Sequence, residues 1–113
     1  MTIYVSNSFS LNMLKHEREL ILVYPESIEN IKKLLRKGFI SAVGHESTAK
    51  VLSKILDIEI PVNRVEIKIE RGDKLVVFQL LQRLPEGKVL SEEELRQVKY
   101  RFLVVEPVVG EVM

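Results

Sequence analysis

Apolar and polar residues alternate over several short stretches of this chain, a pattern typical of β-strands. Residues 64–70 place charged side chains between apolar ones, as in a strand with one exposed face. Residues 75–81 are almost continuously apolar, which indicates a central strand, and Arg71-Gly72-Asp73 predicts a turn that joins the two strands as a hairpin. We expect Pro25 and Pro107 to end two of the strands, because proline cannot donate a backbone hydrogen bond. About five strands are predicted, over residues 2–6, 20–24, 64–70, 75–81 and 101–106.

Helical spacing of apolar residues marks three further segments, each preceded by a residue type that caps helix N-termini. The first helix carries a cluster of cations between Lys32 and Lys37, where they complement the negative end of the helix dipole, and Gly38 is its expected C-cap. Ser91 and Glu94 have the spacing of a capping box. The expected helices begin at Ser27, at Ser47 or Thr48, and at Ser91, the last two run to about residues 56 and 99, and a helical turn over 11–14 is capped by Ser8 or Ser10.

Strands and helices interleave along the chain, which predicts an α/β fold with a mixed sheet of about five strands and flanking helices. No linker, internal repeat or low-complexity segment divides the sequence, so residues 1–113 are expected to form a single domain. A chain of 113 residues can bury a real core, but its size is one at which oligomerisation often adds stability.

The charges of the chain are almost balanced, with 17 basic and 16 acidic residues and a net charge of +1. Binding of long nucleic acid without sequence preference requires many phosphate contacts, so this balance argues against such a partner. A local basic pocket for a small anionic ligand remains compatible with it. Abundant Glu, Lys, Ile and Val without Cys or Trp also fits a protein from a thermophile.

The chain contains no cysteine, which excludes disulfides, thiolate chemistry and cysteine-ligated zinc. No apolar run approaches the roughly 20 residues that span a bilayer, and the N-terminus opens directly into a strand pattern without a signal peptide. We therefore expect a cytoplasmic protein without a membrane partner. No His, Asp and Glu spacing resembles a metal site, and no glycine-rich phosphate loop occurs, so neither a metal nor a cofactor is expected.

His45, one of two histidines, lies where the second helix is expected to begin. Free backbone N–H groups at a helix N-terminus favour anions, and histidine changes its charge near neutral pH. His45 is therefore a candidate general acid or base, with a structural capping role as the alternative. His16 lies in a polar connection, and we assign it to the surface.

Arg83 and Glu86 follow the predicted central strand, and ligands of open α/β sheets usually bind at strand ends. Arg83 could stabilise charge on a phosphate while Glu86 orients Arg83 or His45. The alternative is an exposed ion pair that contributes little to stability.

Asn7, Ser10 and Asn12 cluster after the first strand. One or two of them could serve as helix caps, but three short hydrogen-bonding side chains could also read base edges or ribose hydroxyls. Arg64 opens a strand on its polar side, where it could either bind a ligand or face solvent.

Four segments, in the same order along almost the whole chain, resemble the viral anti-CRISPR ring nucleases, small proteins of archaeal viruses, phages and some bacterial genomes. Ser8 occupies a position that is often alanine in that family, and the stretch between Leu14 and Gly44 is shorter than in some relatives. The matching segments are Ser-Asn-Ser-Phe-Ser-Leu-Asn-Met-Leu (6–14), Gly-His-Glu-Ser-Thr (44–48), Asn-Arg-Val-Glu-Ile-Lys (63–68) and Gln-Arg-Leu-Pro-Glu-Gly-Lys-Val-Leu (82–90).

The resemblance implies metal-independent cleavage of cyclic tetra-adenylate, the second messenger of type III CRISPR systems, to short linear oligoadenylates with 2′,3′-cyclic phosphate ends. It implies a homodimer with the ring at its interface under a lid, for which the 7–12 segment and the lysine-rich helix end are both candidates. A viral copy would silence immunity in the host cytoplasm, and a cellular copy would switch off its own response. The resemblance makes His45 the acid that protonates the departing 5′-oxygen, and it supports catalytic roles for Arg83 and Glu86. Ligand-binding positions match at Asn7, Ser10, Ser47 and Arg64, and Asn12 joins them as a neighbour of the first two. The alternative function is non-catalytic binding of a cyclic oligonucleotide or nucleic acid.

Overall fold

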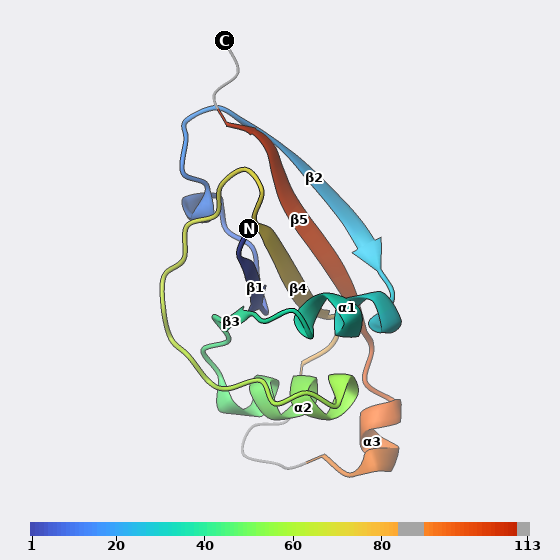
Figure 1. Ribbon diagram of the computed structural model, residues 1–113. Helices are drawn as coiled ribbons and strands as arrows, with labels where there is room; N and C mark the ends of the chain where they lie inside the picture. Colours follow the sequence, from blue (N-terminus) through green and yellow to red (C-terminus); the bar gives the residue numbers. More distant parts are fainter. Residues whose placement is uncertain (84–89, 111–113) are drawn as a thin grey trace.

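A five-stranded sheet with the order β2-β5-β4-β1-β3 organises the chain in the computed structural model, which describes residues 1–83 and 90–110 (Figure 1). Strand β1 runs parallel to β3 and β4, whereas β5 is antiparallel to β4 and β2. The sheet is therefore mixed, and the predicted α/β fold class is confirmed. The strands are β1 (Ile3–Ser6), β2 (Glu19–Glu26), β3 (Ile40–Ser41), β4 (Lys74–Leu80) and β5 (Tyr100–Gly110).

The helices begin at capping residues that the sequence largely predicts. Ser27 caps α1 (Ile28–Leu35), Ser10 caps the short 3₁₀-helix η1 (Leu11–Met13), and Ser91 forms the expected capping box with Glu94 at α3 (Glu92–Arg96). Two predicted caps are wrong: α1 ends at Arg36 rather than Gly38, and α2 (Glu46–Leu56) begins at His45 rather than at Ser47 or Thr48. Within the described ranges, no helix is long and apolar enough to cross a membrane.

Alternate side chains of the sheet face two separate cores. On one face, Val76 and Phe78 of β4 pack with Ile31 of α1 and Leu52 of α2. On the other face, which we call the η1 face, Leu75 and Val77 pack against residues that flank η1 and against Ile67 and Ile69. The buried apolar side chains of α1 and α2 all belong to the first core, and the η1-face core contains no residue of either helix.

Residues 64–70 do not form the predicted strand, and no hairpin joins them to β4. Their backbone makes an isolated bridge between Leu14 and Ile69, in which the Ile69 N–H donates to the Met13 carbonyl at 2.7 Å. Both edges of β4 are already paired, with β1 and with β5, so this segment has no edge of β4 to join. Its alternation is retained, since Ile67 and Ile69 are buried while the charged neighbours are exposed. Strand β3, which the sequence did not predict, is too short to leave a pattern.

The two prolines expected to end strands lie inside them. Pro25 belongs to β2, an edge strand with β5 as its single neighbour in the sheet, so its missing N–H can face outward. Pro107 lies beyond the last β4–β5 pair, which is Leu75 with Val105, and there β5 pairs with β2 alone. Prolines are tolerated at both places because one side of the strand has no partner.

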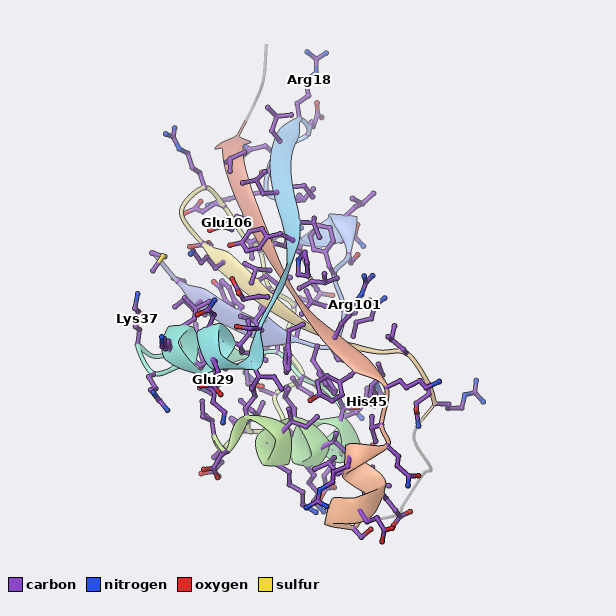
Figure 2. All side chains as sticks on the ribbon, turned by 90° about the vertical axis from the view of Figure 1, so that its right-hand side faces the viewer. Arg18, Glu29, Lys37, His45, Arg101 and Glu106 are labelled. Atoms are coloured by element: carbon purple, nitrogen blue, oxygen red, sulfur yellow. The ribbon has the colours of Figure 1, made fainter. Side chains whose placement is uncertain are left out.

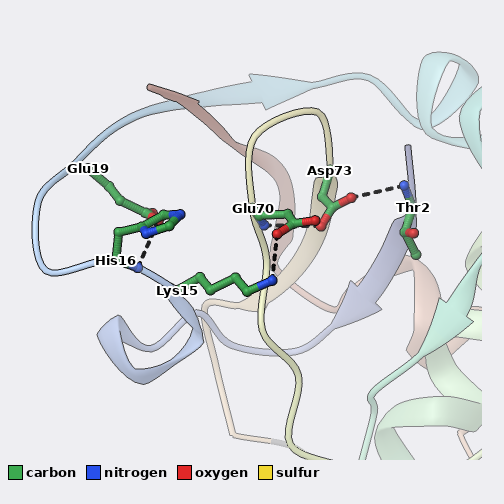
Figure 3. A network of polar contacts seen from close by, with 6 residues as sticks. All are labelled: Thr2, Lys15, His16, Glu19, Glu70 and Asp73. Carbon is green, nitrogen blue, oxygen red and sulfur yellow. Dashed lines mark hydrogen bonds and ion pairs between the residues drawn. The ribbon is translucent and has the colours of Figure 1, made fainter. Parts of the chain in front are cut away.

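A polar network holds the turn before β4 against the N-terminus (Figure 3). The Asp73 carboxylate accepts hydrogen bonds at 3.0 Å from the backbone N–H groups of Thr2 and Glu70. The Lys15 ammonium donates to the Glu70 carboxylate at 2.7 Å, and this hydrogen bond with its charge lowers the pKa of Glu70 and raises that of Lys15. The Arg71-Gly72-Asp73 triplet is thus a structural turn, as expected, although not of the predicted hairpin.

Candidate functional site

Three parallel strands end at one edge of the sheet, and a candidate residue follows each of them. Because β1 is parallel to both β3 and β4, the carboxyl ends of all three strands lie at the same edge. Asn7 directly follows β1, His45 follows β3, and Arg83 follows β4. In Figure 1 the ends of these strands point toward α2. Such a carboxyl edge is where open α/β sheets bind ligands.

His45 lies at the N-cap position of α2 with an exposed side chain. Its backbone carbonyl accepts the first helical hydrogen bond, from the Ala49 N–H at 3.0 Å. The imidazole makes no capping hydrogen bond, so the structural alternative of a capping side chain is wrong. The ring is therefore available to a ligand beside the positive end of the helix dipole.

The first of two hollows, which we call the His45 hollow, lies beside this edge and has a volume of about 400 Å³. The Arg64 Nε group donates a hydrogen bond to the Gly44 carbonyl at 2.8 Å. A Cβ atom on Gly44 would stand 3.2 Å from the Arg64 Cγ atom, so glycine here permits the arginine to cross the backbone closely. The lining residues are Ala42, Gly44, His45, Arg64, Val65 and Glu66.

The second, which we call the Asn12 hollow, adjoins the first and has a volume of about 410 Å³. Val65 and Glu66 line both hollows. The Lys68 ammonium donates to the Asn12 carbonyl and so ties η1 to the 64–70 segment. The lining residues are Ser10, Asn12, Met13, Val65, Glu66, Ile67 and Lys68.

The structure thus brings four predicted site residues to two adjoining hollows: His45, Arg64, Ser10 and Asn12. Asn7 and Ser47 are half-buried and line neither hollow. Arg83 is exposed at the same sheet edge, outside the linings of these two hollows. Glu86 lies outside the described residues. His16 is exposed, as expected, and its backbone N–H donates to Glu19 at 3.1 Å.

Sequence reasoning missed Gly44, Glu66 and Lys68 as lining residues. The alternation over 64–70 was interpreted as a solvated strand face, although the same pattern places Arg64, Glu66 and Lys68 on one side. In the part of the chain that the structure describes, no group of three or more His, Asp or Glu side chains could hold a metal ion. The polar part of the two linings consists of Arg64, Lys68, His45, Ser10, Asn12 and one carboxylate, Glu66. Its two cations suit a phosphate-bearing ligand.

Comparison with known proteins shows the family. The profile of the STIV B116-like family matches residues 3–102. The chain is 44% identical over 111 residues to Uncharacterized protein 26 of Sulfolobus islandicus filamentous virus, covering 96% of this chain and 94% of that protein. The chain belongs to the STIV B116-like family. A second viral relative of this B116-like protein, ORF117 of Acidianus two-tailed virus, is 34% identical over 98 residues. The match covers 83% of this chain and 84% of that protein.

The fold of the B116-like family has been solved in B116 of Sulfolobus turreted icosahedral virus. That structure superposes with a TM-score of 0.81 at 33% identity and covers 94% of this chain and 99% of its own. A bacterial relative, YddF of Bacillus subtilis, is 30% identical over 82 residues. The match covers 70% of this chain and 76% of that protein. Viral relatives from Sulfolobus and Acidianus viruses agree with the predicted viral and thermophilic setting, and the family also has a bacterial relative.

The close approach at Gly44 makes a testable prediction for this B116-like protein. Gly44→Ala should displace the Arg64 side chain and shift the NMR signal of its Nε–H, because the new Cβ would crowd the Arg64 Cγ atom. We expect the free energy of unfolding to change by no more than about 1 kcal/mol, since the crowded atom belongs to an exposed side chain.

Gly38→Ala is the matched control, and we expect it to lower stability without moving the Arg64 signal. Gly38 has a positive φ of 105° and open space around it. Alanine there should reduce the free energy of unfolding by about 1 kcal/mol or more and leave the Arg64 signal in place. An unchanged Arg64 signal in Gly44→Ala would contradict the proposed crowding.

Proposed function

We propose that this protein is a ring nuclease that cleaves cyclic tetra-adenylate to short linear oligoadenylates with 2′,3′-cyclic phosphate ends. The observation that carries the proposal is the exposed His45 imidazole, free of capping duty, in a hollow that it shares with Arg64. The ligand and the reaction come from the resemblance of four segments to the viral ring nucleases. Membership in a family with viral members supports that resemblance.

The proposed chemistry uses the ligand's own ribose as nucleophile. A ribose 2′-hydroxyl attacks the adjacent phosphorus, its proton passes to solvent, and the bond from phosphorus to the 5′-oxygen breaks. The His45 imidazolium donates a proton to that departing oxygen. The protein therefore has to hold the ring in line and stabilise the charge on the phosphate. This mechanism requires no external nucleophile and no metal ion.

Two arginines supply positive charge in this proposal. Arg83 stabilises the charge that develops on the scissile phosphate, and Glu86 orients Arg83 or His45. Arg64 is anchored through its Nε to the Gly44 carbonyl, which leaves its terminal nitrogens for a phosphate. Asn7, Ser10, Asn12 and Ser47 would contact the ring through its bases or riboses.

A four-fold ring matches a two-fold symmetric homodimer, in which each subunit presents one active site to opposite phosphodiesters. We therefore propose a homodimer that holds the ring at its interface. A viral copy would act in the host cytoplasm and silence type III CRISPR signalling.

The test incubates the protein with labelled cyclic tetra-adenylate in excess EDTA and resolves the products. We expect linear products with cyclic phosphate ends. Retention of intact ligand without cleavage would overturn the enzyme and favour a non-catalytic binding protein for the same messenger. If the protein neither binds nor cleaves the ring, both the enzyme and the binding-protein alternative are overturned.

A further inference from the structure

Arg101 is an exposed cation at the same sheet edge as the candidate site, and neither the predictions nor the hollows include it. It lies on β5 directly opposite Gln79 of β4. Gln79 is the residue before the end of β4, so the pair stands next to the carboxyl edge from which Arg83 follows. The Arg101 Nε group donates a hydrogen bond to the Gln79 Oε1 atom.

Strand alternation places Arg101 on the η1 face. Side chains of a strand point to opposite faces in turn, and Leu75 and Val77 of β4 belong to the η1-face core. Gln79 continues that row. Leu103 and Val105 of β5 pack in the same core, so Arg101 continues the matching row. Figure 2 shows Arg101 and His45 on the side of the molecule away from Lys37 of α1.

Arg101 and Arg64 are held in the same manner. Each is exposed, each donates through Nε to a neutral oxygen of a neighbour, and neither has a carboxylate partner among the described residues. A guanidinium bound through Nε keeps its two terminal NH₂ groups for another acceptor, and its orientation is already fixed before a ligand arrives. Such an arginine suits the oxygens of a phosphate.

The spacing of the strands sets the size of a ligand that could reach both residues. Neighbouring strands lie ~4.8 Å apart, and β5 is separated from β3 by β4 and β1, which makes roughly 14 Å between their backbones. A mononucleotide carries a single phosphate group and cannot offer one phosphate to His45 and a second to Arg101, whereas a cyclic or linear oligonucleotide that crosses several strands can.

We propose that Arg101 binds a phosphodiester of the oligonucleotide ligand, distant from the phosphodiester that His45 serves, and that Gln79 orients it. This inference rests on the proposed function. Arg101 then selects oligonucleotides over mononucleotides, because its contact exists only for a ligand that crosses several strands.

The test measures the affinity for cyclic tetra-adenylate of Arg101→Gln in a His45→Ala background, in which the ligand stays intact. We expect Kd to rise about ten-fold or more, and the slope of log affinity against log salt concentration to fall by about 0.7 for each lost phosphate contact. Arg101→Lys should recover part of the affinity, because lysine retains the positive charge but lacks the planar guanidinium that donates two parallel hydrogen bonds. AMP should bind equally to the His45→Ala protein with and without Arg101→Gln.

Arg71→Gln is the matched control. Arg71 is an exposed arginine in the turn before β4, at the opposite edge of the sheet. The Arg71→Gln substitution should leave both Kd and the salt slope unchanged. In single-turnover cleavage with His45 intact, Arg101→Gln should raise the half-saturating protein concentration and leave the rate at saturation near that of the parent protein.

The outcomes separate the two proposals. Parental Kd and salt slope in a folded Arg101→Gln protein would overturn this inference and leave the ring-nuclease proposal standing. An equal loss of affinity in Arg71→Gln would also overturn it, because the effect would then be general charge. Failure of the unmodified protein to bind or cleave the ring would overturn both. If Arg101→Gln lowers the melting temperature, the affinity of Arg101→Lys and the salt slope replace it as the test. An unchanged salt slope together with parental affinity in Arg101→Lys would then overturn the inference.

Discussion

Replacing His45 with alanine should reduce single-turnover cleavage of cyclic tetra-adenylate by about 10²–10⁴-fold, the usual contribution of a positioned general acid. The departing 5′-oxygen is strongly basic and needs a proton as its bond to phosphorus breaks. Binding should change little, because in the proposed mode arginines hold the phosphates, and the substitution retains them. Stability should also change little, since the imidazole is exposed and makes no capping hydrogen bond.

The measurement uses labelled ring with protein in excess, so that the chemical step is separated from product release. His16→Ala is the control, because His16 is the other histidine of the chain and lies exposed in the connection between η1 and β2. It should cleave at the parental rate. Cleavage by His45→Ala within a few-fold of the parent would defeat the assignment of the acid, even if the protein remains a ring nuclease.

Phe78→Ala should lower the free energy of unfolding by about 3–5 kcal/mol. The Phe78 side chain is 0% exposed and lies in the core between the sheet and the helices. Its ring centroid is 5.5 Å from that of Tyr100 and 5.4 Å from that of Phe102. Removal therefore leaves a cavity inside an aromatic cluster that joins β4 to β5. Small domains are stable by only about 5–15 kcal/mol, so the loss takes a large part of the total.

Urea or guanidinium unfolding at constant protein concentration measures this loss. Phe78→Leu keeps most of the volume and should lose substantially less. Leu11→Ala is the exposed control, since Leu11 is 75% exposed on η1, and it should stay within about 0.5 kcal/mol of the parent. A loss below about 1 kcal/mol in Phe78→Ala would contradict the central position of this ring.

Local chemistry determined several features that the structure confirms. Ser27, Ser8 or Ser10, and the Ser91–Glu94 capping box were predicted because a cap needs only a side-chain oxygen near the first N–H groups of its own helix, and Ser10 is the cap observed at η1. The central position of β4 followed from its continuous apolar run, because a strand buried on both faces leaves no polar side.

The failures concern partners that are distant in the chain. The alternation over 64–70 specifies which side chains are buried, but not which backbone pairs with it, and here the partner lies near Met13. The effect of Pro25 and Pro107 depended on which strand edges remain unpaired, a property of the whole sheet. Glu86 and its part in the site lie outside the described residues, so that hypothesis stays a prediction.

The candidate site divides in the same way. Sequence alone singled out His45 for its place at a helix start, and Ser10 and Asn12 as short hydrogen-bonding side chains. The resemblance to the ring nucleases added a ligand-binding role for Arg64. The tertiary structure decided that these four line adjoining hollows, that Gly44 anchors Arg64, and that Arg101 stands at the same edge. Caps and burial periodicity follow from neighbours within a few residues, whereas strand order and the meeting of side chains require contacts between segments far apart in the chain.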